Sequence, residues 1–264
     1  MLIQRPIRSI SFDRIIIHEY YNPYEEPIPK YFILGLPDAG LVGAIASRYL
    51  VTSKNMKLIG EIDSPALFPP VTVVHKHTPM SPMQLYISDD RRMIVLVSEA
   101  PVPAPAIYPL SYAIIEYARE IGIQYILSLS GIAVPNRLQI TKPKLYYLAS
   151  NDKLAEEAEK LGFNKLEEGF IAGPYAVIMK ESRRRNINNL AIFSESFFDL
   201  PDPEAAATAL TGLSKFVGIE INVDKLLEEA ELLKLQTREL MRQTKRAMTE
   251  MQKHYEKQMP LMYQ

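Results

Sequence analysis

Two glutamates stand where an enzyme built on an α/β sheet keeps its acid and its base. Glu99 ends one apolar run, directly before the proline-rich stretch 100–109, and Glu195 ends another. If both runs are strands, the two carboxylates lie at the sheet edge where ligands bind, and they could act as general acid and general base. Carboxylates there also cap turns and helices. We expect the capping role and no enzyme activity, because no catalytic motif accompanies either residue and 127–132 lacks the first glycine of a serine-nucleophile elbow.

A second candidate is the glycine-dense segment 35–43, GLPDAGLVG, between a predicted strand and a predicted helix. Gly35, Asp38, Gly40 and Gly43 could form an anion-binding loop there, because helix N-terminal amides attract negative charge. The spacing matches neither the dinucleotide-binding fingerprint nor the Walker loop. The alternative is a tight strand–helix turn in which Gly40 and Gly43 allow close packing.

The histidines offer a third kind of chemistry, metal binding. His75 and His77 alternate on the predicted strand 71–77 and would share one face of it. A metal ion needs at least one further ligand, the chain has no cysteine, and the remaining histidines, His18 and His254, lie near opposite ends of the sequence. We therefore predict no metal site and no cofactor.

The composition of the chain limits the classes of partner that we expect it to bind. The chain has 264 residues, a net charge of −1 and 47% hydrophobic residues, so no broad basic surface for nucleic acid is expected. The basic cluster 181–186 lacks interleaved aromatic residues and suits a solvated helix end. No window approaches the roughly 20 apolar residues of a membrane span, and the first residues do not form a signal peptide. With no cysteine, we expect a cytoplasmic protein.

An alternation of predicted strands and helices positions the candidate residues. Apolar runs predict strands at 14–20, 31–36, 71–77, 83–88, 93–99, 124–132 and 189–195. Amphipathic stretches predict helices at 40–51, 107–122, 151–162, 174–186 and 202–218. Several strands are apolar at consecutive positions, as in strands covered on both faces. The fold class is therefore α/β, a mostly parallel sheet flanked by helices.

The character of the sequence changes after residue 221. Residues 222–258 contain no glycine or proline, and acidic residues precede basic ones, as the helix dipole favours. A 4-3-4-3 seam typical of coiled coils runs through Leu226, Ala230, Leu233, Thr237, Leu240, Thr244, Ala247 and Met251. We predict an α/β domain over 1–221 and, over 222–264, a long C-terminal helix with a flexible tail. The helix could project from the body or pack back on it.

Pro260 forbids continuation of this helix, so the last four residues are released from it. They read Leu-Met-Tyr-Gln. Tyr263 offers a flat apolar face and a hydroxyl donor, Met262 can fill an adaptable apolar pocket, and Gln264 adds the terminal carboxylate. Such residues suit capture of a chain end by a partner protein.

Four blocks of the sequence agree in order and spacing with one known family: 32–51, 68–87, 99–135 and 189–231. As a set they resemble the proteasome assembly chaperone family, including its archaeal homologues. The family's usual Pro-Gly is Pro37-Asp38 here. The resemblance implies an α/β fold similar to nucleoside phosphorylases, without enzyme activity as the accepted role.

The resemblance also implies a function for the C-terminal tail. Archaeal members are similar in forming homo-oligomers and in ending with a hydrophobe–Tyr–any-residue (HbYX) motif that binds the proteasome, and Met262, Tyr263 and Gln264 match it. The implied partner is the α-subunit ring of the proteasome core particle, and the implied role is assembly, gate opening or both. Two alternatives remain: a hydrolase of this fold that binds nucleosides or phosphate, and an adaptor acting through its coiled-coil helix.

Overall fold

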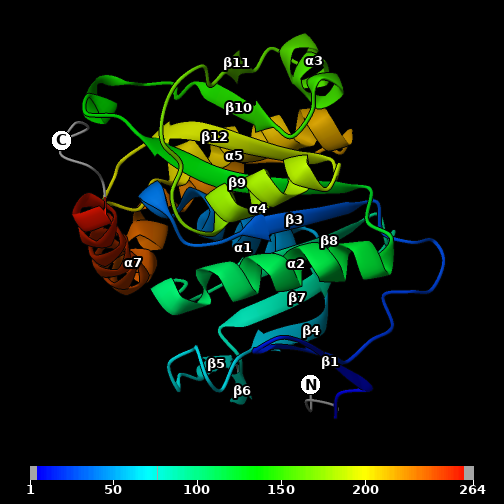
Figure 1. The fold of residues 1–264 in the computed structure, drawn as a ribbon. Coiled ribbons are helices and arrows are strands. Elements are labelled where there is room, and N and C mark those ends of the chain that lie inside the picture. The colour runs from blue at the N-terminus through cyan, green and yellow to red at the C-terminus, as the bar shows by residue number, and fades with distance from the viewer. Residues whose placement is uncertain (1–4, 76, 259–264) are drawn as a thin grey trace.

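A single mixed sheet forms the centre of the molecule (Figure 1). The computed structural model describes residues 5–75 and 77–258, with side chains up to residue 251. Its large sheet has ten strands in the order β1-β2-β4-β7-β8-β3-β9-β12-β10-β11. Their bounds are Arg8–Phe12 (β1), Ile15–Glu19 (β2), Tyr31–Gly35 (β3), Lys57–Asp63 (β4), Met83–Ile87 (β7), Met93–Ser98 (β8), Tyr125–Ala133 (β9), Leu145–Ala149 (β10), Asn164–Lys165 (β11) and Asn189–Ser196 (β12).

The middle of the sheet is parallel. Strands β8, β3, β9 and β12 pair in parallel, whereas β1, β2, β4 and β7 form an antiparallel series joined to β8. Alternate residues of the parallel strands belong to two different cores: Ile33 and Leu127 face one, and Phe32 and Ile126 face the other. Burial on both faces is why these strands read as continuous apolar runs. The α/β prediction is confirmed, and the sheet is mixed.

Helices cover both faces of the sheet (Figure 1). Helices α2 and α4 pack in one core, and α1 and α5 in the other. A separate hairpin of β5 and β6 stands outside the large sheet. The bounds are Val42–Ser53 (α1), Ile107–Ile121 (α2), Asp152–Lys160 (α3), Pro174–Arg184 (α4), Pro203–Val217 (α5), Val73–His75 (β5) and Thr78–Met80 (β6), with short helical turns at Ala39–Leu41 (η1), Ala104–Ala106 (η2) and Arg137–Gln139 (η3).

Helix ends follow local sequence signals. The Asn151 side chain accepts a hydrogen bond from the Leu154 amide at 3.0 Å and so caps α3. Asp202 caps α5 in the same way, Pro203 begins that helix, and Gly218 ends it in the left-handed conformation at φ 69°. The predicted ends of α5 are confirmed.

The sequence did not predict β4 and β10, nor the short strands β1, β6 and β11. In β4, Gly60 and the buried Glu61 interrupt the apolar pattern; the Glu61 carboxylate accepts a hydrogen bond from the Tyr20 hydroxyl at 3.0 Å. Strand β10 is half-buried along most of its length. A weak apolar period leaves such strands without a signal.

The C-terminal region is two helices where one was predicted. Helix α6 spans Asp224–Glu228, and α7 spans Ala230–Gln258. Glu229 between them has φ −89° and ψ 8°, outside the helical region, and this residue divides the two helices. The division of the chain at residue 221 stays a prediction. None of the helices in the described part of the chain combines the length and apolarity needed to cross a membrane.

Candidate functional site

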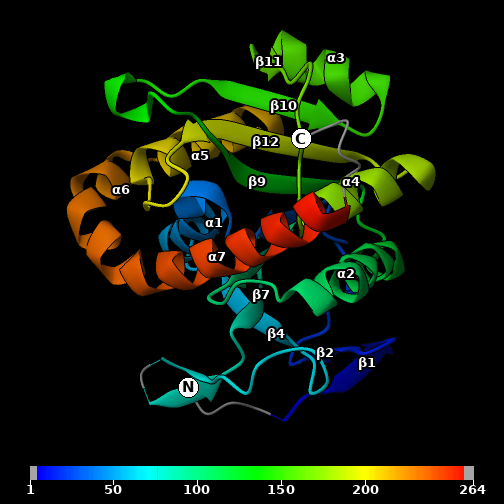
Figure 2. The ribbon, with the colours of Figure 1, turned by 60° about the vertical axis from the view of Figure 1, so that its left-hand side comes forward.

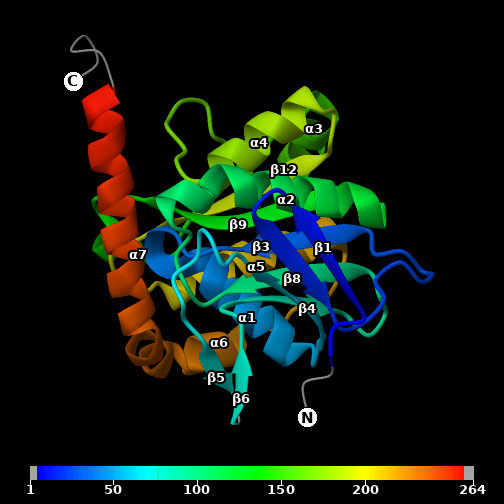
Figure 3. The ribbon, with the colours of Figure 1, turned by 60° about the horizontal axis from the view of Figure 1, so that its bottom comes forward.

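Helix α7 lies across the edge of the sheet at which the parallel strands end (Figures 2 and 3). Its predicted seam faces the body of the same chain: Leu233 and Leu240 pack against one core, Met251 packs against the other, and Thr244 is buried. The opposite face, with Leu232 and Leu235, is exposed. Of the two arrangements predicted for this helix, the described residues adopt the one that packs on its own body.

The predicted proteasome-binding residues Met262, Tyr263 and Gln264, with Pro260, lie outside the described residues. The structure therefore describes α7, the helix that leads to the tail, and this helix ends at Gln258.

A cavity of about 640 Å³ lies between α7 and the ends of the parallel strands. In the described part of the chain, its walls come from the loop after β3, the segment after β8, the end of β9, the segment 166–175 that enters α4, and one face of α7. Phe193 of β12 and Phe198 after it complete the lining. The α7 wall consists of Thr244, Ala247, Met248 and Met251. Open α/β sheets bind ligands at this edge, so the cavity occupies the position where a small molecule is expected.

Asp38 places a carboxyl group in the wall of this cavity. The Ser130 hydroxyl, from β9, donates a hydrogen bond to Asp38 Oδ2 at 2.7 Å. Burial raises the pKa of the Asp38 carboxyl above its ordinary value, and the Ser130 hydrogen bond opposes that shift. The carboxyl is therefore polar, desolvated and held in one orientation.

Tyr175, near the start of α4, fixes the loop that carries Asp38. The Tyr175 hydroxyl accepts a hydrogen bond from the Leu36 amide at 2.8 Å and donates one to the Leu129 carbonyl at 2.8 Å. Its side chain is buried, and burial raises the pKa of the phenol, which stays protonated. One residue thereby ties β3, β9 and α4 together at the base of the cavity.

Close packing accounts for the glycines of the predicted anion loop. A Cβ atom at Gly43 would stand 2.3 Å from the Leu129 carbonyl oxygen, and one at Gly35 would stand 2.0 Å from Ser47 Oγ. Gly40 has φ 62°, and its carbonyl accepts a hydrogen bond from the Asp202 amide at 2.9 Å. These contacts match the alternative of a tight strand–helix turn; anion binding by Gly35, Asp38, Gly40 and Gly43 stays a prediction.

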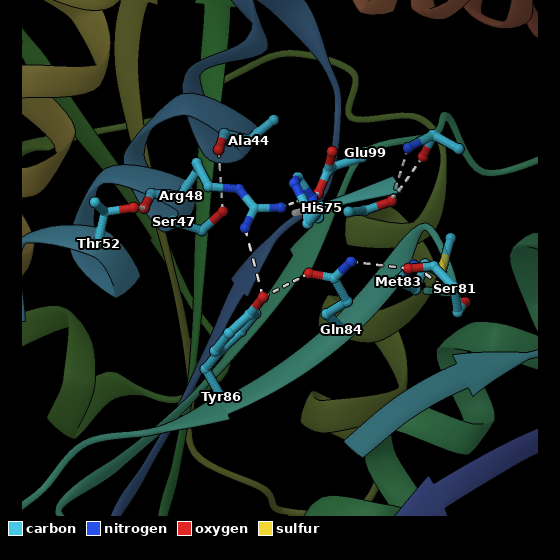
Figure 4. Close-up of polar contacts among 12 residues, drawn as sticks. Ala44, Ser47, Arg48, Thr52, His75, Ser81, Met83, Gln84, Tyr86 and Glu99 are labelled. Carbon is cyan, nitrogen blue, oxygen red and sulfur yellow. Dashed lines mark hydrogen bonds and ion pairs between the residues drawn. The ribbon is translucent and has the colours of Figure 1, made fainter. Parts of the chain in front are cut away.

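Glu99 belongs to a polar cluster outside the cavity wall (Figure 4). The Arg48 guanidinium of α1 donates to its carboxylate, and His75 Nε2 lies 2.8 Å from the same oxygen. Burial and the Arg48 charge lower the pKa of the His75 imidazole. The three side chains tie the β5–β6 hairpin to α1 and to the end of β8.

His77 does not share a strand face with His75, and that prediction was wrong. Strand β5 ends at His75, and His77 lies in the hairpin turn with φ 66°. The chain reverses there, so the alternation of strand side chains stops. Over the residues that the structure describes, no cluster of three or more histidine, aspartate or glutamate side chains could hold a metal ion.

Glu195 and Glu99 have separate partners. The buried Glu195 carboxylate accepts hydrogen bonds from the Lys144 amide at 2.9 Å and from the Tyr146 hydroxyl at 3.4 Å, both from the β10 side. Neither glutamate is among the described residues that line the cavity. Their contacts are those of structural carboxylates at strand ends.

A buried ion pair below the Gly40 turn escaped the sequence analysis. Arg137 binds Asp202 through two hydrogen bonds, Nε to Oδ2 at 2.7 Å and Nη2 to Oδ1 at 2.9 Å, and both side chains are at least 97% buried. Asp202 also caps α5, but its ion-pair partner lies 65 positions away, so no local pattern indicates the pair. Ser130 was missed for the same reason, because a polar residue in an apolar strand does not reveal its partner.

One family model spans most of this architecture. The model of the PAC2 family matches residues 32–241, from β3 to the buried Met241 in α7. The chain belongs to the PAC2 family. The match includes the loop of Asp38, the strand of Ser130 and the start of α4, which together form the cavity's inner wall.

Individual relatives extend the comparison. An uncharacterized protein of Methanocaldococcus jannaschii is 24% identical over 232 residues, 88% of this chain and 92% of that protein. The crystal structure of Pyrococcus furiosus PbaA, described as an archaeal homolog of proteasome-assembly chaperone, matches with a TM-score of 0.79 and 27% identity over 88% of this chain and 99% of PbaA. Pyrococcus furiosus PbaB, described as an archaeal proteasome activator, has the same fold, with a TM-score of 0.71 and 23% identity over 86% of this chain and 98% of PbaB.

Proposed function

We propose that this protein is a non-enzymatic chaperone or activator of the proteasome. The α/β body forms a homo-oligomer, and α7 presents Met262, Tyr263 and Gln264 to pockets of the core-particle α-ring. The observation that carries the proposal is the similarity in fold and sequence to PbaA, described as a homolog of proteasome-assembly chaperone, over 88% of this chain. The tail pattern supports it independently, because it stands outside the region 32–241 that defines the family.

The tail has the chemistry of an anchor. The carboxylate of Gln264 can pair with a lysine or with backbone amides, and Tyr263 and Met262 can bury apolar surface in a neighbouring pocket. Pro260 keeps the chain from continuing as helix, so the last residues can extend into a pocket. Each contact is modest, which favours binding through several tails at once.

The first experiment is hydrolysis of a fluorogenic peptide by an archaeal core particle, with the full chain and with a variant lacking residues 262–264. We expect the full chain to bind and, if it opens the gate, to stimulate hydrolysis; the truncated chain should do neither. A pull-down on the same samples separates binding without stimulation, the result for a chaperone, from absence of binding.

Two further variants make the test specific to the motif. One added residue after Gln264 should abolish binding, because it moves the carboxylate away from Tyr263. Gln264→Ala is the matched control and should bind normally, because the pattern accepts any last residue and the carboxylate remains. Normal binding by the extended chain would contradict the proposal.

A further inference from the structure

The cavity between α7 and the sheet has an uneven distribution of charge. Two of the described residues that line it carry an ionisable acid, Asp38 and Glu168, and none of them is lysine, arginine or histidine. The buried Arg137 is paired with Asp202, and its side chain does not line the cavity. Apart from the two carboxyl groups, the lining is mostly aliphatic and aromatic, with Phe193 and Phe198 among its members.

The size of the cavity suits a small organic molecule. Its volume of about 640 Å³ falls inside the range of roughly 300–1,000 Å³ that ligand pockets occupy. Its polar anchor is held in place, because Ser130 donates to one Asp38 oxygen at 2.7 Å and Tyr175 ties the loop, at Leu36, to Leu129 of β9. A group already fixed by neighbouring side chains loses less conformational freedom when it binds a ligand.

We propose that this cavity binds a small organic cation, an ammonium group on an aromatic or aliphatic body. The ammonium pairs with the Asp38 carboxylate, and the body lies against Met248, Met251 and the facing aromatic rings. Phosphates and carboxylates bind poorly here, since the described wall opposes them with two acids. The charge expected of the ligand is thus opposite to that of the anion considered for the 35–43 loop.

Ligand bound in this cavity also contacts α7. Because Thr244, Ala247, Met248 and Met251 form one wall and the strand ends form another, an occupant bridges the helix and the body. Binding therefore holds α7 against the sheet edge and slows local opening of that helix. This consequence does not depend on what the residues after Gln258 bind.

Three indoles that differ only at the end of an ethyl chain test the proposal: tryptamine, tryptophol and indolepropionate. Calorimetry on the full chain should show tryptamine binding at least about tenfold more tightly than tryptophol, the difference expected for a charge-assisted hydrogen bond, and indolepropionate binding most weakly. The methyl signals of Met248 and Met251 should shift in NMR spectra, and the backbone amides of 244–251 should exchange more slowly with tryptamine present.

Two variants locate the site. Asp38→Asn should remove the preference for tryptamine over tryptophol while leaving the weaker, apolar binding. Ala247→Phe should fill the cavity and abolish binding of all three probes, whereas Arg246→Phe, on the exposed face of the same helix, should not. Equal affinity for the three probes, a preference for indolepropionate, or no binding to the folded wild-type chain would each overturn the proposal.

Discussion

Arg137 and Asp202 form an ion pair through two hydrogen bonds, and each side chain is almost fully buried. Removing one partner would leave the other charge buried and unpaired. We expect Arg137→Met to lower the free energy of unfolding by about 3–5 kcal/mol. Urea denaturation monitored by circular dichroism measures this change.

The matched control uses the exposed member of the same cluster. Glu204 also accepts a hydrogen bond from Arg137, at 2.9 Å, but its side chain is 52% exposed. Glu204→Gln should therefore cost less than about 1 kcal/mol. Similar losses for Arg137→Met and Glu204→Gln would show that burial does not set the strength of this contact.

The buried Glu19 makes the free energy of unfolding depend on pH. Glu19 is buried in β2, and burial raises its pKa above the ordinary value of 4.5, although the Tyr117 hydroxyl donates to it at 2.9 Å. The folded state therefore holds this proton more tightly than the unfolded state does. The resulting stability is present below pH 4.5 and is lost as pH rises through the folded-state pKa.

Glu19→Gln keeps an acceptor for Tyr117 but removes this titration. Relative to the wild type, the free energy of unfolding of the variant should rise with pH from about 4.5 and then level off. Urea denaturation at a series of pH values measures the difference. Glu250→Gln, at an exposed position, should follow the wild type at every pH. A pH-independent difference for Glu19→Gln would refute this account.

At the level of elements, α7 is held on the body by the side chains that it packs against the core. Met241 is 2% exposed and belongs to the core shared with α1 and α5, whereas Leu235 in the same helix is 68% exposed. We expect Met241→Ala to lower the free energy of unfolding by about 2–5 kcal/mol and to speed amide exchange along α7. Leu235→Ala should change both much less. Hydrogen exchange with mass spectrometry measures amide exchange along α7 in the two variants.

The elements that could be predicted are those whose signal is local. Strands β3 and β8 are apolar along most of their length, and β9 and β12 contain apolar runs, because both faces of these strands are covered. Helix α5 carries its own cap and stop. Strand β4 was missed because Gly60 and Glu61 break its pattern, and Glu61 is satisfied by Tyr20, 41 positions away. Asp38 was singled out by the sequence, but its partner Ser130 lies 92 positions away. A cavity built from such distant contacts has no signature in any one segment.

At the scale of the whole molecule, the cavity lies between the sheet and α7 and is lined by both. The ends of the parallel strands and one face of α7 line the cavity. Figure 2 shows α7 running across this side of the sheet, and α7 leads to the residues proposed to bind the proteasome. The tail's strength as a ligand then depends on how many copies the assembly presents, because a second tail on the same assembly binds at a high effective concentration.

The number of tails that one assembly presents therefore sets its affinity for the core particle. If the protein is a homo-oligomer that presents several tails, the full chain should bind the core particle about 10²–10⁴-fold more tightly than a synthetic peptide of residues 252–264. Competition against a labelled tail peptide compares the two affinities, and sedimentation velocity gives the oligomeric state of the same preparation. A peptide carrying Tyr263→Ala is the control and should not compete. Equal affinity of chain and peptide would mean that the tails act singly, and the oligomer would then need another explanation.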